Sequence, residues 1–435
     1  MTLYGSSFSC QYITSRELFM IVVSAGSRRS PIRFVKPMAS HDRQNAHENA
    51  HYGANQQGTR ERNERLILTL LRRTPGLAKA EIARRTGLSA QTVSRLIAAL
   101  ENDGLILRGA PQRGRVGQPS IPLSLDPEGA FFFGLKVGRR SAELVATDFL
   151  GRIVGREKQI YDYPDFTTVL EGCFKAINRL IERLGPARAR RLAGLGIAMP
   201  FHLWEWAPRI GVPNDAMSDW KTRDLKSELE RHLSIPVFLQ NDATAACSAE
   251  LVFGDTSRPP NFASFHVAFF IGGGLVLRGS IYAGAHGNAA GFGPLPVPDS
   301  TGRMHPLIDA ASLSNLERRL LENGVDSQQI WMDPEGWSIP EHLLLDWTEN
   351  AAFALAQAVR ATQTVLDLDA ILIDGWLPRN LRAALTDGVR AELEQIDMTG
   401  MAVPAITAGT IGADARTLGA ASLPLTARFL VELPD

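Results

Sequence analysis

The first regular spacing of apolar residues along the chain begins near residue 60. Leu66, Ile67, Leu70 and Leu71 recur three and four positions apart, which is the spacing that gathers side chains on one face of a helix. The stretch before them lacks this periodicity and ends in a polar run, a composition that cannot bury an apolar core. We therefore expect a disordered N-terminal extension over residues 1–58, followed by a first helix.

Two further helices are predicted, one over Ala78–Thr86 and one starting at Ser89. Gly87 and Leu88 join them, and a glycine at this point permits a tight reversal of the chain. We expect Ser89 to cap the second of these helices, because its hydroxyl can accept a hydrogen bond from the free amide of Thr92. The buried stripe of that helix consists of Val93, Leu96, Ile97 and Leu100.

The opposite face of the helix that starts at Ser89 carries short polar or basic side chains near its N-terminus. Such a face is typical of a recognition helix, which offers these side chains to base edges in the DNA major groove. After this helix, two short apolar segments flank the arginine- and glycine-rich stretch Arg113–Pro119, which indicates a β-hairpin wing able to contact phosphates or the minor groove. The residues expected to contact DNA are Ser89, Ala90, Gln91, Thr92, Ser94, Arg95, Arg113, Arg115 and Gln118.

Positive charge is concentrated in this part of the chain. The whole sequence has 46 Lys and Arg residues against 46 Asp and Glu residues, so its net charge does not attract nucleic acid. Residues 59–118 hold twelve basic residues against five acidic ones, a surplus of seven. The alternative is an ordinary small helical domain with solvated arginines. Three helices in this order, a basic wing and a local charge surplus together favour DNA binding.

From Ala130 onward, glycine- and alanine-rich strands alternate with helices, which indicates an α/β fold. At 435 residues the chain is too long for a single core. The predicted elements are three strands over Phe131–Val137, Ala142–Asp148 and Arg152–Gln159, a helix over Phe166–Leu184 and a strand over Leu192–Met199. This is the order of an actin-like nucleotide-binding lobe. We expect a winged helix-turn-helix domain over residues 59–127 and a two-lobed domain over residues 128–430.

Cysteine content and hydropathy indicate the cellular compartment in which the protein resides. Cys10, Cys173 and Cys247 are scattered and odd in number, which argues against a disulfide framework, and they form no Cys-x-x-Cys pair that would suggest a zinc site. No apolar run reaches the roughly 18 residues that suggest a membrane span. The sequence favours a cytoplasmic protein without a membrane partner.

Several motifs in the second domain resemble those of the ROK family, which groups sugar kinases with repressors that carry an N-terminal winged helix. They are Gly194–Pro200, Val237–Ala246, Gly284–Ala289, Ala408–Gly412 and Leu418–Ala421. The resemblance implies an actin-like ATPase fold of two lobes around a cleft, with sugar bound deep inside and, in the kinases, ATP above it. It also implies effector contacts at Asn214, Asn241, Asp242 and Asn288. For Asn241 and Asp242, a turn that caps the following helix is the alternative, and both roles can hold together.

The chain departs from the kinase members of this family at the phosphate loop. Those kinases carry an Asp-x-Gly-x-Thr loop whose carboxylate acts through magnesium, whereas this chain has Lys136 at the aspartate position, followed by Arg139 and Arg140. Without the metal-orienting acid, phosphoryl transfer loses its electrostatic support, and we interpret the arginine pair as part of a surface hairpin. The triple glycine Gly272–Gly274 is retained, but close packing also explains it.

The chain also departs from the family at its zinc and second sugar positions. The family's sugar-binding Glu and zinc-binding His are replaced in Ala290–Pro294, and its cysteine-rich zinc motif is replaced by Ser300–Asp309. His286 and His305 lack a third ligand and are interpreted as structural. We therefore expect no cofactor: neither zinc nor magnesium-ATP.

The sequence favours a DNA-binding transcriptional regulator, a repressor of carbohydrate metabolism genes whose kinase-like domain is catalytically inactive. The expected partners are a double-stranded operator, a sugar or sugar-derivative effector and further copies of the chain in a homodimer or homotetramer. Two alternatives remain: an active sugar kinase with an appended DNA-binding module, and a DNA-binding protein without an effector.

Overall fold

The computed structural model of the protein describes residues 56–111, 120–213 and 215–431. Most of the expected N-terminal extension therefore lies outside the described residues. Its last three residues do not, and they are helical: the first helix, α1 (Gln56–Arg73), begins before the expected boundary at residue 59. No helix in the described part is both long and apolar enough to cross a membrane.

The N-terminal domain contains three helices and a two-stranded hairpin. They are α1, α2 (Lys79–Thr86), α3 (Ala90–Asn102), β1 (Ile106–Arg108) and β2 (Leu123–Leu125). The two strands are antiparallel, with Ile106 opposite Leu125. The stripe of α3 predicted from the sequence is buried, and it packs against α1 and α2 around Ile67, Leu71 and Ile82. The helical order is thus confirmed. The two apolar segments predicted on either side of Arg113–Pro119 form the wing strands β1 and β2.

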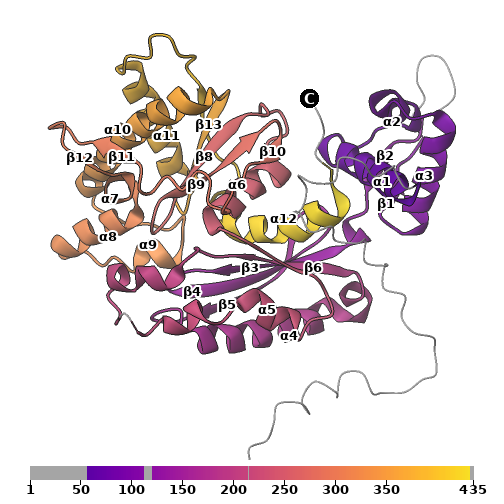
Figure 1. Ribbon diagram of the computed structural model, residues 1–435, viewed down its shortest axis with the longest axis horizontal. Helices are drawn as coiled ribbons and strands as arrows, with labels where there is room; N and C mark the ends of the chain where they lie inside the picture. Colours follow the sequence, from indigo (N-terminus) through magenta and orange to yellow (C-terminus); the bar gives the residue numbers. More distant parts are fainter. Residues whose placement is uncertain (1–55, 112–119, 214, 432–435) are drawn as a thin grey trace, which may run out of the picture. The chain divides into compact units, whose positions relative to one another are not determined.

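The first lobe of the second domain contains a five-stranded sheet in the order β5-β4-β3-β6-β7. The strands are β3 (Phe131–Val137), β4 (Ser141–Thr147), β5 (Ile153–Ile160), β6 (Leu192–Ala198) and β7 (Val237–Gln240). One face is covered by α4 (Phe166–Ala189) and α5 (Leu225–Glu230), and the other by α6 (Asp242–Phe253) and α12 (Ala415–Phe429) (Figure 1). Short 3-10 helices occupy Pro127–Gly129, Leu203–Ile210 and Ser218–Lys221. The meander predicted from the sequence is present.

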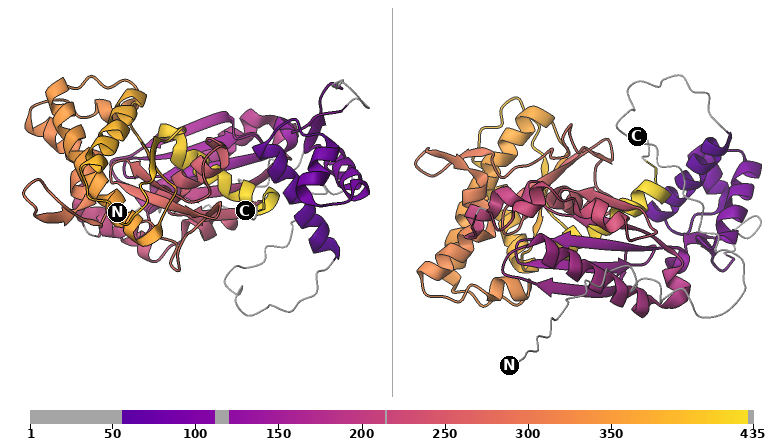
Figure 2. Two further views of the ribbon diagram at one scale, coloured as in Figure 1. Left: turned by 90° about the horizontal axis from the view of Figure 1, so that it is seen from above. Right: turned by 60° about the horizontal axis from the view of Figure 1, so that its bottom comes forward.

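The second lobe repeats the strand order of the first, β10-β9-β8-β13-β14. Its strands are β8 (Phe262–Val267), β9 (Gly272–Leu277), β10 (Ser280–Ile281), β13 (Ala370–Gly375) and β14 (Ala405–Ala408), with a separate hairpin of β11 (Pro296–Pro298) and β12 (Met304–Pro306). Its helices are α7 (Leu307–Ala311), α8 (Leu313–Glu322), α9 (Gln329–Met332), α10 (Glu341–Leu366) and α11 (Arg379–Glu394), and a 3-10 turn spans Gly412–Asp414. The repeated order is the two-lobed arrangement expected from the sequence (Figure 2).

Helix α12 is seated against its neighbours through positions where only glycine fits. A Cβ atom at Gly196 of β6 would overlap the carbonyl oxygen of Ala420, and one at Gly419 would overlap the carbonyl oxygen of Ala245 on α6. Backbones that approach this closely leave no room for a side chain. Helix α12 therefore packs directly against the backbones of the first sheet and of α6.

The glycine run on β9 has a packing explanation. A Cβ at Gly273 would meet the ring of Phe292 and the carbonyl oxygen of Ser264, and one at Gly274 would meet the Cys247 side chain. The three glycines are thus required where β9 touches α6 and the loop after β10. This explains their presence without a nucleotide.

Candidate functional site

The N-terminus of α3 forms an exposed surface made mostly of short side chains. Gly87 adopts the left-handed conformation, with φ of 68°, and ends α2. The Ser89 hydroxyl accepts a hydrogen bond from the Thr92 amide at 3.2 Å, as predicted, and lies 2.9 Å from the Thr92 hydroxyl. The side chains of Ala90, Gln91, Ser94 and Arg95 are all exposed, and Thr92 is half-buried. The residues predicted for base contacts therefore share one solvent-facing surface.

Arg95 differs from its basic neighbours in its interactions. Arg84 and Arg85 both bind Glu81, and Arg108 binds Glu101 across the turn between α3 and β1. Within residues 56–111, Arg95 forms no ion pair. A guanidinium without an internal carboxylate partner can contact a base or a phosphate without first breaking an ion pair.

Ser89→Ala is expected to loosen the start of α3. Loss of an N-cap serine costs about 1 kcal/mol, so the N-terminal amides of α3 should exchange with deuterium about fivefold faster. Hydrogen–deuterium exchange mass spectrometry measures this. Ser94→Ala, an exposed change in the interior of the same helix, serves as the control. Equal protection in both variants would contradict the capping role.

The expected wing contacts Arg113, Arg115 and Gln118 lie outside the described residues. They remain predictions. Replacing either arginine by alanine should weaken binding to all DNA sequences alike and lower the slope of log affinity against log salt by about 0.9 for each phosphate that the variant no longer neutralises. Titrations at several salt concentrations measure the slope. A sequence-dependent weakening with an unchanged slope would contradict phosphate binding by the wing.

The winged helix shares its core with the second domain. Phe132, Phe149, Ala421 and Leu425 belong to the same apolar cluster as Ile67 and the α3 stripe. The aromatic Phe429 joins Phe132 and Phe149 through edge contacts. This packing was not visible in the sequence, because Phe132 and Phe149 are more than 60 residues from Ile67, and Ala421 and Leu425 more than 350.

Three arginines connect the two domains by bonding to backbone carbonyls. Arg65 of α1 donates to Thr426 at 3.2 Å and also to Leu430, and Arg72 donates to Phe149. Arg191 donates to Asp103 at 2.8 Å and to Gly104 at 3.0 Å. Each of these bonds joins a side chain of one domain to the backbone of the other. The bond is therefore broken if the two domains separate.

Asn241 and Asp242 lie at the N-terminus of α6, between the two sheets. The Asn241 side-chain oxygen accepts from the amides of Ala243 at 3.0 Å and Thr244 at 3.3 Å, so the residue is the N-cap of α6. Asp242, half-buried, accepts from Arg416 of α12 at 3.4 Å. The capping role considered from the sequence is present. It leaves the Asn241 side-chain amide and one Asp242 oxygen for a ligand.

The other two expected effector contacts are Asn288 and Asn214, and the structure describes only Asn288. Asn288 is exposed on the loop between β10 and β11. A Cβ at the preceding residue, Gly287, would lie 3.1 Å from the ring of Phe201, so this loop of the second lobe reaches the chain just after β6. Asn214 lies outside the described residues.

Lys136 is buried in the same region. Its amine lies 3.9 Å from a carboxylate oxygen of Glu143, its neighbour on β4, and 5.9 Å from the centre of the Trp376 ring of the second lobe. Burial and the positive charge of Arg416 lower the pKa of this amine to about 7. A buried amine at the position of the kinase aspartate cannot coordinate magnesium as a carboxylate does. The residues present therefore do not fit magnesium-ATP.

Lys136→Met is expected to stabilise the chain at neutral pH. Between pH 7 and its ordinary pKa of 10.5, the amine is largely uncharged in the folded state and protonated in the unfolded state. The folded state then binds fewer protons, so the contribution of Lys136 to stability rises with pH. Removing the amine should raise the melting temperature at pH 7 by about 2 °C or more.

The test is differential scanning fluorimetry from pH 7 to pH 9. The advantage of Lys136→Met over the unaltered chain should shrink as the pH rises. Lys175→Met, at an exposed position of α4, is the control and should show no such change. An advantage that stays constant or grows with pH would contradict the burial of a titrating amine.

The arginines after Lys136 form the turn of the β3–β4 hairpin, as predicted, and Arg140 is exposed, but the surface interpretation was wrong for Arg139, which is half-buried. The Arg139 guanidinium lies 3.6 Å from the centre of the Phe269 ring and 3.5 Å from Glu317 of α8. Arg140 approaches the same carboxylate at 3.9 Å, and Trp331 donates to it at 2.9 Å. The β3–β4 turn is thus bound to the second lobe, a long-range contact that a local pattern cannot show.

The loop after β14 has its backbone amides occupied by buried carboxylates. Glu250 accepts from the amides of Thr410 at 2.6 Å and Ile411 at 2.8 Å, and Asp374 accepts from that of Gly412 at 3.2 Å. Burial, together with the charge of Glu250, raises the pKa of Asp374 to about 6. Amides bonded in this way are not free to hold a phosphate.

The family's zinc positions hold other residues here. His286 is exposed and His305 is half-buried, with its Nδ1 3.2 Å from the Pro306 carbonyl. Within the described residues, no three His, Cys, Asp or Glu side chains are grouped so that they could hold a metal ion. A cavity of about 370 Å³ borders His305 and is also lined by Asp299, Asp309 and Glu349. The donor set therefore does not fit a thiolate zinc site.

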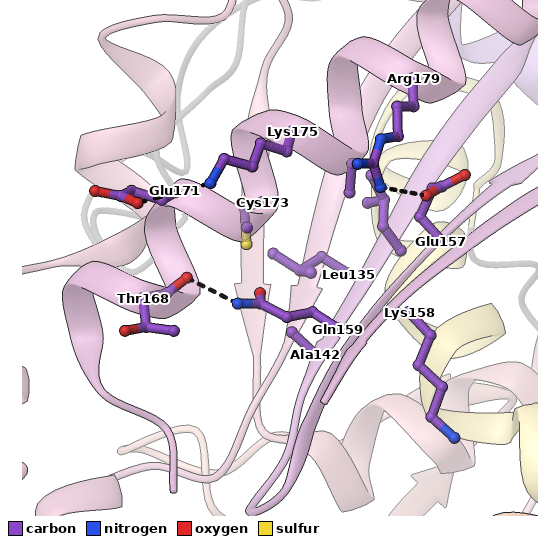
Figure 3. A pocket seen from close by; sticks show the side chains of 13 residues that line it. Leu135, Ala142, Glu157, Lys158, Gln159, Thr168, Glu171, Cys173, Lys175 and Arg179 are labelled. Carbon is purple, nitrogen blue, oxygen red and sulfur yellow. Dashed lines mark hydrogen bonds and ion pairs between the residues drawn. The ribbon is translucent and has the colours of Figure 1, made fainter. Parts of the chain in front are cut away.

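A second pocket, of about 260 Å³, lies between β5 and α4, away from Asn241 and Asp242 (Figure 3). Two ion pairs lie along it, Arg179 with Glu157 at 3.3 Å and Lys175 with Glu171 at 3.8 Å, and the Gln159 amide donates to the Thr168 carbonyl at 3.1 Å. Sequence reasoning did not find this pocket. We do not assign it a ligand.

Comparison with known proteins agrees with this architecture. Residues 132–427 match the ROK family, and residues 60–106 match winged helix-turn-helix DNA-binding domains. The uncharacterized protein y4fQ of Sinorhizobium fredii is 26% identical over 371 residues, which are 84% of this chain and 91% of that protein. The xylose repressor of Bacillus spizizenii is 24% identical over 235 residues, 54% of this chain and 60% of the repressor.

A solved structure shows the same fold over most of the chain. A ROK family transcriptional regulator, a homologue of the E. coli MLC protein, superposes with a TM-score of 0.61 at 18% identity, covering 85% of this chain and 97% of that one. The fold expected from the sequence is confirmed. The chain belongs to the ROK family, and its N-terminal part is a winged helix-turn-helix DNA-binding domain.

Proposed function

We propose that the protein is a DNA-binding repressor of carbohydrate metabolism genes, controlled by a sugar or sugar-derivative effector in the cleft of its ROK domain. The observation that carries the proposal is the exposed face of α3, where Gln91, Ser94 and Arg95 face solvent in the first turns after a capped N-terminus. Side chains of this size and chemistry read base edges in the major groove. A dimer or tetramer would place two such helices on a palindromic operator.

Helix α12 supports a route from the cleft to the DNA-binding domain. Arg416 in its first turn contacts Asp242, and the carbonyl of Thr426 near its end accepts from Arg65 of α1. Fifteen residues of α-helix span about 22 Å, so one helix joins the two positions. An effector that changes the contact at Asp242 can shift α12, and with it the winged helix. Linkage then makes operator binding and effector binding depend on each other.

We also propose that the cleft does not transfer phosphate. Lys136 stands where the kinases need a carboxylate, and the amides of the loop after β14 are bonded to Glu250 and Asp374. The full chain, incubated with magnesium-ATP and a panel of sugars, should release ADP no faster than without sugar. Sugar-dependent turnover would overturn this part of the proposal and favour the kinase alternative.

The test of the regulatory function is selection of genomic DNA by the purified full chain. Sheared DNA from the source organism is incubated with the protein, and the retained fragments are sequenced. The proposal expects enrichment of a few fragments that share a palindromic sequence near genes of sugar uptake or catabolism. Retention without any common sequence would show that the domain binds DNA only non-specifically.

A further inference from the structure

A buried polar centre lies between the two sheets, formed by residues of both lobes. On β3, alternation places Lys136 on the face opposite the apolar residues Leu135 and Val137, which belong to the core under α4. On β8, His266 shares the α6-facing side with Phe262, and on β13 Asp374 shares it with Leu372. Arg416 of α12 completes the centre.

Several hydrogen-bonding atoms at this centre have no partner. His266 is 3% exposed, and neither of its ring nitrogens is hydrogen-bonded within the described residues. The Nε of Arg416 is likewise buried and unpaired there. A buried polar atom without a partner is costly, and native structures rarely leave several together. The cluster therefore indicates a group that the protein binds from outside.

The carboxylates around the centre are already engaged. Glu143 binds Arg156, and Asp374 accepts from Arg382 at 2.7 Å. Asp242 and Arg416 are 3.4 Å apart. Lys136 lies 3.9 Å from its nearest carboxylate oxygen, which is beyond hydrogen-bond distance. The groups left without a strong partner thus include three donors: the Lys136 amine, one ring nitrogen of His266 and the Nε of Arg416.

The charges around the imidazole agree with this geometry. Burial lowers the pKa of His266 well below its usual range, and the positive charges of Arg416, Lys136 and Arg382 lower it further. Of these cations, Arg382 binds Asp374, which lies opposite His266 in the register of β13 and β8. An added negative charge at this point would stabilise the protonated form of Lys136.

We propose that Lys136, His266 and Arg416 bind an oxyanion, the carboxylate or phosphate group of an anionic effector. The inference rests on the proposed function, because it gives the chemical class of the effector in the same cleft. Lys136 and Arg416 supply charge-assisted donors, and the neutral imidazole supplies one N–H donor. Asn241 and Asp242 remain available for hydroxyl groups of the same molecule. The lysine that replaces the kinase aspartate thus makes the centre suited to an anion without a metal.

The test uses the full chain without divalent metal and at constant ionic strength. Inorganic phosphate and sodium formate are the two oxyanion probes, with sodium chloride as the matched reference. Binding to the folded state raises the melting temperature. We expect a rise with at least one probe, and the pattern tells phosphate from carboxylate: a rise with phosphate alone indicates a phosphate site, and one with formate a carboxylate site. No rise with either would overturn the proposal.

Substitutions locate the bound anion. Lys136→Met should weaken binding about tenfold or more, since it removes a charge-assisted hydrogen bond, whereas Lys136→Arg should retain part of it. Lys175→Met, on the exposed face of α4, should bind as the unaltered chain does. If Lys136→Met does not fold, His266→Gln takes its place. Equal affinity in the unaltered chain and in every variant of the centre would show an adventitious ion only.

A second experiment separates this inference from the regulatory function. Release of the selected operator is measured with glucose, glucuronate and glucose 6-phosphate, and with xylose and xylonate. The inference is supported if an acidic or phosphorylated sugar releases the operator at a concentration at least tenfold lower than the corresponding neutral sugar requires. Release by the neutral sugars alone overturns it and leaves the regulator intact. Failure to retain any operator would instead count against the regulatory function, while the anion titration above still decides the site.

Discussion

Arg95→Ala is expected to reduce the preference of the protein for its operator over random DNA by about tenfold or more. Arg95 is exposed on α3 and, within residues 56–111, forms no ion pair that its removal would break. A bidentate arginine contact with a guanine contributes about 1–3 kcal/mol of discrimination. The effect should therefore be seen in operator affinity, with little change for random DNA. Gln91→Ala, at the neighbouring exposed position, should act in the same direction.

Arg84→Ala is the matched control for this prediction. Arg84 is also an exposed arginine of the winged helix, but it donates to Glu81 at 2.6 Å and lies on α2. It should change affinity for operator and random DNA to the same small extent. Fluorescence anisotropy with labelled duplexes measures both affinities. Equal losses of discrimination in Arg95→Ala and Arg84→Ala would show that α3 does not read the sequence.

Asp242→Ala is expected to abolish the response to effector while operator binding persists. Asp242 lies in the first turn of α6 and contacts Arg416, so it belongs both to the effector cleft and to the contact with α12. Its removal takes away an acceptor for the ligand and frees the start of α12. The operator should stay bound even at about ten times the effector concentration that releases half of it from the unaltered chain. The carbonyls that Arg65 and Arg72 bond to belong to Thr426, Leu430 and Phe149.

Asp387→Ala provides the control for Asp242→Ala. Asp387 is an exposed aspartate of α11 that pairs with Arg390 at 2.7 Å, away from the cleft. It should leave both operator affinity and effector response unchanged. Operator release is followed by gel retardation across an effector titration. An unchanged effector response in Asp242→Ala would show that the effector binds elsewhere.

The winged helix could be predicted because its signals are local. Gly87 needs a left-handed conformation, and Ser89 caps the helix that follows it within four residues. The periodic stripe from Val93 to Leu100 then specifies which face is buried. Each of these features depends on neighbours in the sequence, so a pattern along the chain is sufficient to find it.

The organisation of the cleft depends on contacts between distant residues, and the sequence did not disclose it. Arg139 was interpreted as solvated because Phe269 and Glu317 are more than a hundred residues away. Lys136 was recognised only as the loss of an aspartate, since its burial depends on α12 and on Trp376 of the other lobe. The family motifs indicated Asn241 and Asp242, but not the unpaired imidazole of His266.

The packing of the winged helix against the second domain also could not be predicted from the sequence. The expected boundary at residue 127 separated two domains, whereas the apolar residues of α1 and α12 form one cluster. Arg65 and Arg72 counted in the sequence as part of the basic surplus of the winged helix. In the structure they donate to carbonyls of the second domain, so they are structural rather than available to DNA.

The ratio of affinities for the selected operator and for a scrambled duplex of equal length tests the central claim most directly. It is measured with the full chain near physiological salt, without effector. A regulator that reads sequence through α3 should prefer the operator by about a thousandfold or more. A ratio within tenfold of unity would contradict the account, because the exposed face of α3 would then serve no sequence recognition.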